Sequence, residues 1–194
     1  MLNSENNQTD KIRLYLGTAC GKTTATFGVL MRALSTGKNV TLVFFDKLEA
    51  NSSEGKTLNY LASNYPDNHL GRLKYYYTGI NRLKAGPNGS FRFYSSPNGI
   101  LPTDKAEAKR GLALLTEGLT NGDEIVIADE LLDVARVGLI DFEDVRALLS
   151  LRKELTLLIM TGRKAPDWLV NEATTISTTV QLKHHGKADE GIDC

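Results

Sequence analysis

The sequence predicts an α/β fold in which helices cover both faces of a mostly parallel sheet. Two observations support this expectation. Strand-like apolar runs alternate along the chain with helix-like runs, which is the pattern of crossover connections between parallel strands. The 194 residues, 41% of them apolar, are enough to form one sizeable core. We expect a flexible, polar N-terminus at residues 1–10 and a single domain at residues 11–194.

The first predicted strand, Lys11 to Leu16, runs into a turn that two glycines bound, and a helix-like stretch from Thr24 to Leu34 follows. This arrangement aims backbone N–H groups and a helix N-terminus at one point, where an anion is stabilised. Lys22 would reach the terminal phosphates of a nucleotide, and the hydroxyl of Thr23 would bind magnesium. The predicted phosphate-binding loop consists of Gly17, Thr18, Ala19, Cys20, Gly21, Lys22, Thr23 and Thr24.

This loop is shorter than the common pattern, because only Thr18, Ala19 and Cys20 separate its glycines. A strand-to-helix turn that happens to contain Lys-Thr is the alternative for the loop alone. Cys20 either fills the turn or serves as a redox-sensitive thiol, since a helix N-terminus lowers the pKa of a thiol.

A downstream strand supports the nucleotide interpretation. The apolar run from Asp123 to Asp129 ends in the carboxylates of Asp129 and Glu130. Magnesium bound to phosphates takes hard oxygen ligands of this kind beside the loop hydroxyl. For this segment alone, a buried strand followed by a solvated acidic turn is the alternative.

The other elements fill the chain between and after these two segments. Strands are predicted at 40–45, 73–78, 155–161 and 175–182, and helices at 57–64, 103–119, 142–151 and 166–172. The segment Gly79 to Pro102 interrupts the alternation, since it is rich in glycine and proline around three aromatic residues. A loop of this length is often a binding element or a mobile lid, and a decorative insertion is the alternative.

Composition excludes several classes of partner. The formal net charge is zero, so no overall field favours nucleic acid or an acidic membrane. The sequence contains no apolar run of membrane-spanning length and no signal peptide, which predicts a cytoplasmic protein with small-molecule substrates. Cys20 and Cys194 form no disulfide framework, and the adjacent His184 and His185 make a poor metal pair.

Segments spread over most of the chain from Ile12 onward resemble one family. They are Gly21-Lys22-Thr23-Thr24 with Ala25, Gly28, Arg32 and Ala33, then Gly37-Lys38-Asn39-Val40, Asp129-Glu130-Leu131, Gly138-Leu139-Ile140-Asp141, Thr161-Gly162-Arg163, Ala165-Pro166, Leu182-Lys183-His184 and Gly191-Ile192-Asp193. This set resembles the ATP:corrinoid adenosyltransferases, or cob(I)alamin adenosyltransferases, of the phosphate-loop type. Those proteins also have three residues between the loop glycines. The resemblance implies a single-domain P-loop (RecA-like) fold.

The activity that this resemblance implies is transfer of the 5′-deoxyadenosyl group of ATP to the cobalt of a reduced corrinoid, with release of triphosphate. Cobalt(I) is itself the nucleophile, so no catalytic side chain is expected. The implied cofactors and substrates are ATP, Mg²⁺ and a corrinoid such as cobalamin. A second copy of the chain, forming a homodimer, and an electron-donating reductase are the implied partners.

The resemblance also assigns roles to individual residues. The loop holds the triphosphate, Lys47 and Arg163 add positive charge around it, and Thr23, Asp129 and Glu130 bind the metal. Ordinary solvated surface charge is the alternative for Lys47 and Arg163. The family has glycine and lysine where this loop has alanine and cysteine, which predicts weaker phosphate binding.

The family's corrinoid-contacting segment, of the Gly-Phe-Thr-Trp type, is absent in that form. Phe91, Phe93 and Tyr94 occupy the corresponding region and are predicted to contact the corrinoid, where aromatic side chains would displace the lower cobalt ligand. Two other functions stay open. One is a P-loop ATPase in which Glu130 activates water, and the other is a non-catalytic protein that binds nucleotide or corrinoid.

Overall fold

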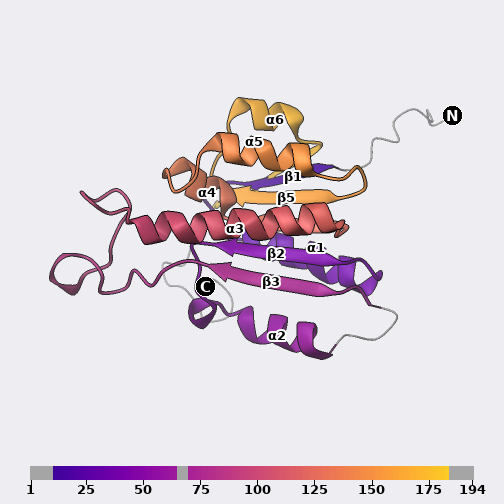
Figure 1. Cartoon of the computed structure of the whole chain (residues 1–194), viewed down its shortest axis with the longest axis horizontal. Helices are drawn as coiled ribbons and strands as arrows, with labels where there is room; N and C mark the ends of the chain where they lie inside the picture. The colour runs from indigo at the N-terminus through magenta and orange to yellow at the C-terminus, as the bar shows by residue number, and fades with distance from the viewer. Residues whose placement is uncertain (1–10, 65–69, 184–194) are drawn as a thin grey trace.

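Six parallel strands form one sheet in the computed structural model, which describes residues 11–64 and 70–183 (Figure 1). The strands are β1 (Ile12–Leu16), β2 (Val40–Phe45), β3 (Leu73–Thr78), β4 (Ile125–Asp129), β5 (Leu157–Gly162) and β6 (Thr175–Thr178). Their order across the sheet is β3-β2-β4-β5-β1-β6, and every neighbouring pair is parallel. All carboxyl ends therefore lie along one edge of the sheet.

Helices cover both faces of this sheet (Figure 1). One face carries α1 (Lys22–Ser35) and α2 (Gly55–Asn64), and the other carries α3 (Pro102–Asn121), α4 (Leu131–Arg136), α5 (Phe142–Leu151) and α6 (Asp167–Glu172). Two short 3₁₀ turns, η1 (Glu49–Asn51) and η2 (Pro87–Gly89), lie in the connections. The predicted fold class, an α/β domain with a parallel sheet between helical layers, is confirmed.

Side chains of β2 show why the central strands are apolar throughout. Leu42 and Phe44 pack on the α1 and α2 face, whereas Val43 and Phe45 pack on the α3 face beside Leu115. All six residues of this strand are buried. A strand that is covered on both faces gives a continuous apolar run rather than an alternating one, and this is the run that the sequence displays.

Every predicted element except the last strand matches an observed one to within two residues at each end. The first helix begins at Lys22 rather than Thr24, and the short helix α4 was not predicted. The last strand ends at Thr178 rather than Leu182. The reason is that β6 pairs only with β1, whose last residue, Leu16, lies opposite Thr178.

Several predictions concern residues that the structure does not describe. The flexible N-terminus at 1–10, the adjacent histidines at 184 and 185, the resemblance at 191–193 and Cys194 all lie outside the described residues. Within the described part of the chain, no helix combines the length and the apolar character that crossing a bilayer requires.

The predicted long segment between β3 and α3 extends beyond the carboxyl ends of β2 and β3 (Figure 1). A buried ion pair attaches its second half to α3. Two nitrogens of Arg92 donate to the carboxylate of Asp104 over 2.6 and 2.8 Å, and both side chains are less than 10% exposed. Arg92 also donates to the carbonyl of Gly99, and the N–H of Leu101 donates to Asp104 over 2.7 Å. The segment is therefore fixed at its base.

Replacement of Asp104 should destabilise the protein strongly, because it leaves the Arg92 guanidinium buried without its partner. We expect Asp104→Ala to lower the free energy of unfolding by about 3–5 kcal/mol at pH 7, measured by urea denaturation. The control is Asp144→Ala, because Asp144 accepts the N–H of Asp141 and caps α5 in the same way. Loss of this cap should cost only about 1 kcal/mol. Equal losses in the two variants would contradict the role of the ion pair.

The effect of Asp104 should also depend on pH. Burial opposes the charged carboxylate, but Arg92 and the N–H of Leu101 outweigh burial and hold the pKa of Asp104 below its ordinary value. A lowered pKa stabilises the folded state above about pH 4, and this contribution disappears as the pH falls. The stability difference between the wild type and Asp104→Ala should therefore be smaller at pH 3 than at pH 7.

Candidate functional site

The predicted phosphate-binding loop leaves β1 and enters α1 through two glycines with left-handed backbone conformations. Gly17 has φ 124° and Gly21, the residue that caps α1, has φ 102°. Side chains rarely tolerate such angles, so glycine is required at both positions. A Cβ atom on Gly17 would lie only 2.3 Å from the carbonyl oxygen of Thr179, which comes from the neighbouring strand. The loop is thus held closely against the end of β6.

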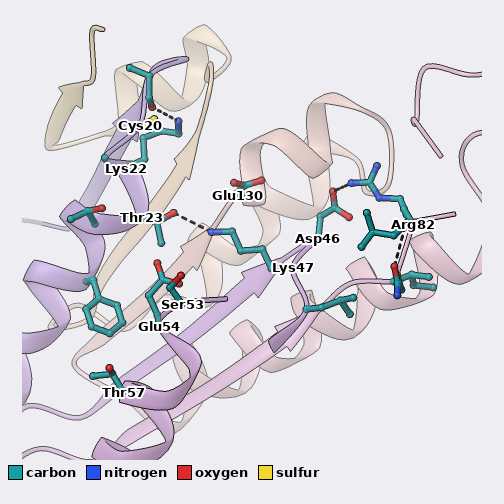
Figure 2. A pocket seen from close by; sticks show the side chains of 18 of the residues that line it. Cys20, Lys22, Thr23, Asp46, Lys47, Ser53, Glu54, Thr57, Arg82 and Glu130 are labelled. Carbon is teal, nitrogen blue, oxygen red and sulfur yellow. Dashed lines mark hydrogen bonds and ion pairs between the residues drawn. The ribbon is translucent and has the colours of Figure 1, made fainter. Parts of the chain in front are cut away.

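The side chain of Lys22 folds over this loop. Its Nζ donates to the carbonyl oxygens of Gly17 over 2.8 Å and of Ala19 over 3.1 Å. Lys22 also lines the cavity described below (Figure 2). The ammonium is therefore positioned between the loop backbone and the cavity, where it can turn toward an anion.

Asp129, at the end of β4, connects three other elements. Its carboxylate is fully buried and accepts hydrogen bonds from the hydroxyl of Thr23 over 3.1 and 3.3 Å. The Nζ of Lys47, beyond the end of β2, lies 2.7 Å from Asp129 and donates to the Thr23 hydroxyl over 3.1 Å (Figure 2). Burial disfavours the charged amine, but the carboxylates of Asp129 and Glu130 outweigh it and raise the pKa of Lys47, which stays protonated.

Thr161, at the end of β5, completes the surroundings of Asp129. Its buried hydroxyl donates to Asp129 over 2.8 Å and accepts the backbone N–H of Glu130 over 2.7 Å. Because β5 lies between β1 and β4, this side chain sits between the loop strand and the acidic strand. The resemblance had included Thr161 without giving it a role, since nothing in the sequence indicates these contacts.

Glu130 follows Asp129 with φ 63° and is the N-cap residue of helix α4. Its half-buried side chain lines the cavity near Lys47 (Figure 2). Burial raises the pKa of Glu130 above its ordinary value, although Lys47 opposes the shift. The unusual start at a positive φ explains why the short helix escaped prediction.

A cavity of about 850 Å³ opens at the carboxyl edge of the sheet (Figure 2). It lies between the loop, the end of β2, the start of α2 and the first part of the long segment. Its lining consists of Ala19, Cys20, Gly21, Lys22, Thr23, Thr24, Phe27, Asp46, Lys47, Leu48, Ser53, Glu54, Thr57, Ile80, Asn81, Arg82, Leu83, Phe91 and Glu130. The same cavity is therefore lined by three cationic and three acidic side chains, namely Lys22, Lys47 and Arg82, and Asp46, Glu54 and Glu130.

An ion pair between Asp46 and Arg82 forms the end of the cavity farther from the loop (Figure 2). The guanidinium carbon of Arg82 lies 3.9 Å from the ring centre of Tyr94 and 4.8 Å from that of Phe91. The Tyr94 hydroxyl donates to Asp46 over 2.6 Å. Burial raises the pKa of both Asp46 and Tyr94. The sequence interpretation missed Asp46 and Arg82, and the adjacency of Asp46 to Lys47 was the only available signal.

The three predicted aromatic residues occupy different positions. Phe91 lines the cavity, and Phe93 contacts it edge to face with ring centres 4.9 Å apart. Phe93 is 58% exposed, whereas Tyr94 is half-buried against Asp46 and Arg82. Phe91 and Phe93 thus form an exposed aromatic pair at the rim, and Tyr94 supports the ion pair behind them.

The structure brings most of the predicted phosphate and metal residues together, but not all of them. Gly17 and Thr18 begin the loop without lining the cavity. The side chain of Arg163 is exposed and also lies outside the cavity lining. Its backbone takes part in the loop, because its carbonyl oxygen accepts the N–H of Gly17 over 3.3 Å, and its N–H donates to Asp133 over 3.1 Å.

Comparison with known proteins places these features in a family context. A sequence model of the family described as ATP:corrinoid adenosyltransferase BtuR/CobO/CobP matches residues 8–194. The chain is 28% identical over 191 residues to the uncharacterized protein all2391 of Nostoc sp. strain PCC 7120. That match covers 94% of the chain and 46% of the Nostoc protein, so the chain spans about half the length of this relative.

One solved structure to which the chain was matched is the assembled ATPase EscN from the type III secretion system of enteropathogenic E. coli. The alignment covers 84% of this chain and 41% of EscN, with 13% identity and a TM-score of 0.45.

The hydroxyl of Thr161 should be important for stability, because it serves two buried polar groups. Thr161→Val keeps the shape of the side chain but leaves the carboxylate of Asp129 and the N–H of Glu130 each with one partner fewer. We expect the free energy of unfolding to fall by about 1–3 kcal/mol in urea denaturation. Thr161→Ser, which retains the hydroxyl, should recover most of this loss. If Val and Ser variants were equally stable, the proposed hydrogen bonds would contribute nothing.

Proposed function

The chain belongs to the family of ATP:corrinoid adenosyltransferases, and from this membership we propose that it transfers the 5′-deoxyadenosyl group of ATP to the cobalt of a reduced corrinoid. Cobalt(I) would supply both electrons of the new cobalt–carbon bond. The bond between the 5′ carbon and the triphosphate oxygen would break, and the triphosphate would leave with that electron pair. The observation that supports this most is the convergence of the phosphate loop, Lys22, Lys47 and an aromatic rim on one cavity.

Triphosphate is the natural ligand of the loop end of the cavity. The N-terminus of α1 and the loop N–H groups face an anion there, and they stabilise negative charge without side-chain reorganisation. Lys22 needs only to turn from the carbonyl oxygens of Gly17 and Ala19 to reach the phosphates. Lys47 stays charged beside them. This positive charge would stabilise the triphosphate as it leaves.

The residues present also fit a magnesium ion brought by the nucleotide. A magnesium ion of this kind needs only one or two carboxylates and a hydroxyl from the protein, because phosphates and waters complete its six ligands. The hydroxyl of Thr23 and the carboxylate of Glu130 supply such oxygens at this end of the cavity. The carboxylate of Asp129 is fully buried next to them and accepts the Thr23 hydroxyl. When bound, the ion would neutralise part of the charge on the triphosphate. In this role, Lys47 would have to move its ammonium away from Thr23.

Phe91 and Phe93 are the proposed contacts for the corrinoid. The pair stands at the rim of the cavity on the segment that Arg92 and Asp104 fix at its base. A large planar ligand would lie against these rings, and the 5′ carbon of ATP would approach it from the cavity. We further expect a cytoplasmic protein, a homodimer and a reductase that reduces the cobalt, as the family resemblance implies.

A P-loop ATPase is the second candidate function. Its support is the carboxylate of Glu130, which lines the cavity beside the phosphate end and has a raised pKa. Such a group could accept a proton from an attacking water. The product separates the two functions, since an ATPase releases phosphate without a corrinoid, and an adenosyltransferase releases triphosphate only with one.

The decisive assay contains ATP, magnesium and chemically reduced cobalamin under anaerobic conditions. We expect the visible spectrum to change to that of alkylated cobalamin while triphosphate accumulates. Lys22→Ala removes the main proposed phosphate contact and should lower turnover about tenfold or more. Lys164→Ala, which removes an exposed lysine beside Arg163, is the control and should leave turnover unchanged. Phosphate release without cobalamin would favour the ATPase, and no product of either kind would favour a binding protein.

Replacement of both rim aromatics should separate the two substrates. Phe91→Ala with Phe93→Ala should raise the KM for cobalamin, because only the corrinoid is proposed to touch these rings, while the Kd for ATP stays within about twofold. Calorimetry measures ATP binding, and the anaerobic assay measures the KM. Leu155→Ala, an exposed apolar residue before β5, is the control for loss of apolar surface. Equal losses for both substrates would contradict the proposed role.

A further inference from the structure

Thr179, far along the chain from the predicted phosphate-binding loop, is hydrogen-bonded to it. We propose that Thr179, which follows the edge strand β6, is a positioning residue that holds the loop in its anion-binding shape. This inference rests on the proposed function only in requiring that the loop bind the phosphates of ATP. It does not depend on which reaction follows.

Thr179 contacts the last residue of β1 and two residues of the loop that follows it. Its backbone N–H donates to the carbonyl oxygen of Leu16 over 2.8 Å, which continues the β1–β6 ladder by one residue. Its hydroxyl lies 3.2 Å from the carbonyl oxygen of Leu16 and 3.3 Å from that of Ala19. Its own carbonyl oxygen occupies the space that a side chain on Gly17 would need. The start and the middle of the loop are thus tied to the same residue.

Lys22 and Thr179 share an acceptor, and this gives the hydroxyl its role. The carbonyl oxygen of Ala19 accepts from the ammonium of Lys22 over 3.1 Å and from the hydroxyl of Thr179 over 3.3 Å. When Lys22 turns its ammonium to a phosphate, it weakens its bonds to Gly17 and Ala19. Among the side chains that the structure describes, the Thr179 hydroxyl is then the donor left at Ala19. It would keep the loop from relaxing at the moment when the anion binds.

The chemistry of the loop makes its shape important. Thr18, Ala19 and Cys20 carry no charge that could attract a phosphate, so these residues can contribute only correctly aimed N–H groups. Peptide N–H groups stabilise an anion only when several of them point at it together. A loop that rotates its Ala19 carbonyl would rotate the following N–H as well, because the two belong to one planar peptide unit. A fixed carbonyl at Ala19 therefore fixes the N–H of Cys20.

Three variants test this role in the full chain. Thr179→Val keeps the branched shape, which suits a strand, and removes only the hydroxyl. Thr179→Ser restores the hydroxyl. Thr178→Val removes the hydroxyl of the preceding residue, whose side chain is exposed, and is the matched control. The Kd for magnesium–ATP is measured by calorimetry, and the KM for ATP and kcat are measured with saturating cobalamin.

We expect Thr179→Val to raise the Kd and the KM for ATP about threefold to tenfold, the range that one hydrogen bond of this type gives. The kcat and the KM for cobalamin should change by less than about twofold. Thr179→Ser should bind ATP nearly as well as the wild type, and Thr178→Val should be indistinguishable from it. Urea denaturation of the same proteins shows whether any loss of affinity reflects partial unfolding.

The outcomes separate the inference from the proposed function. If the wild type binds ATP and Thr179→Val binds it equally well, the positioning role is wrong while the proposed function stands. If Thr179→Val and Thr178→Val weaken ATP binding alike, or if kcat falls in proportion to affinity, the role is also wrong. If the wild type binds ATP but alkylates no corrinoid, the proposed reaction fails, and the affinity series still decides the role of Thr179. A wild type that binds no ATP would overturn both.

Discussion

The buried carboxylate of Asp129 is the constraint on which the arrangement of the site depends. A fully buried negative charge is costly unless cations and hydrogen-bond donors surround it. Here the donors come from three different elements, namely Thr23 on α1, Lys47 after β2 and Thr161 on β5. Satisfying this one group therefore requires the ends of three neighbouring strands, β2, β4 and β5, to meet the start of α1. The same contacts place the loop, the ammonium of Lys47 and the side chain of Glu130 around one cavity.

Much of the fold could be predicted from the sequence, because strands that are buried on both faces give continuous apolar runs. The predicted bounds of β2, which is buried throughout, coincide with the observed ones for this reason. The errors occur where backbone geometry or pairing decides instead. Helix α4 has only six residues and follows Glu130, which has a positive φ, and β6 stops where β1, its neighbour among the described strands, stops. Neither feature leaves a periodic signal in the sequence.

The candidate site likewise contains some residues that the sequence identifies and others that it does not. The sequence could predict the phosphate-binding loop and the acidic end of β4 because each is a local pattern with a known chemical requirement, and their roles stay predictions. Asp46, Arg82 and Thr161 were missed because their importance arises from contacts between distant segments. Arg82 meets Asp46 across 36 positions of sequence, and Thr161 meets Asp129 across 32. Ordinary polar residues of this kind become identifiable only when the strand order is known, and family resemblance supplied no role for them.

The strand order also has a consequence for biosynthesis. Among the strands that the structure describes, β1 comes first along the chain, and it pairs with β5 and β6, which come last. Until β5 and β6 have been translated, the main-chain groups on both edges of β1 lack these partners, and the loop after β1 lacks its contacts with Thr179. Unpaired strand edges promote aggregation, and contacts this far apart in sequence form slowly. During synthesis, β1 and the loop that follows it would therefore be among the last parts of the described sheet to gain their partners.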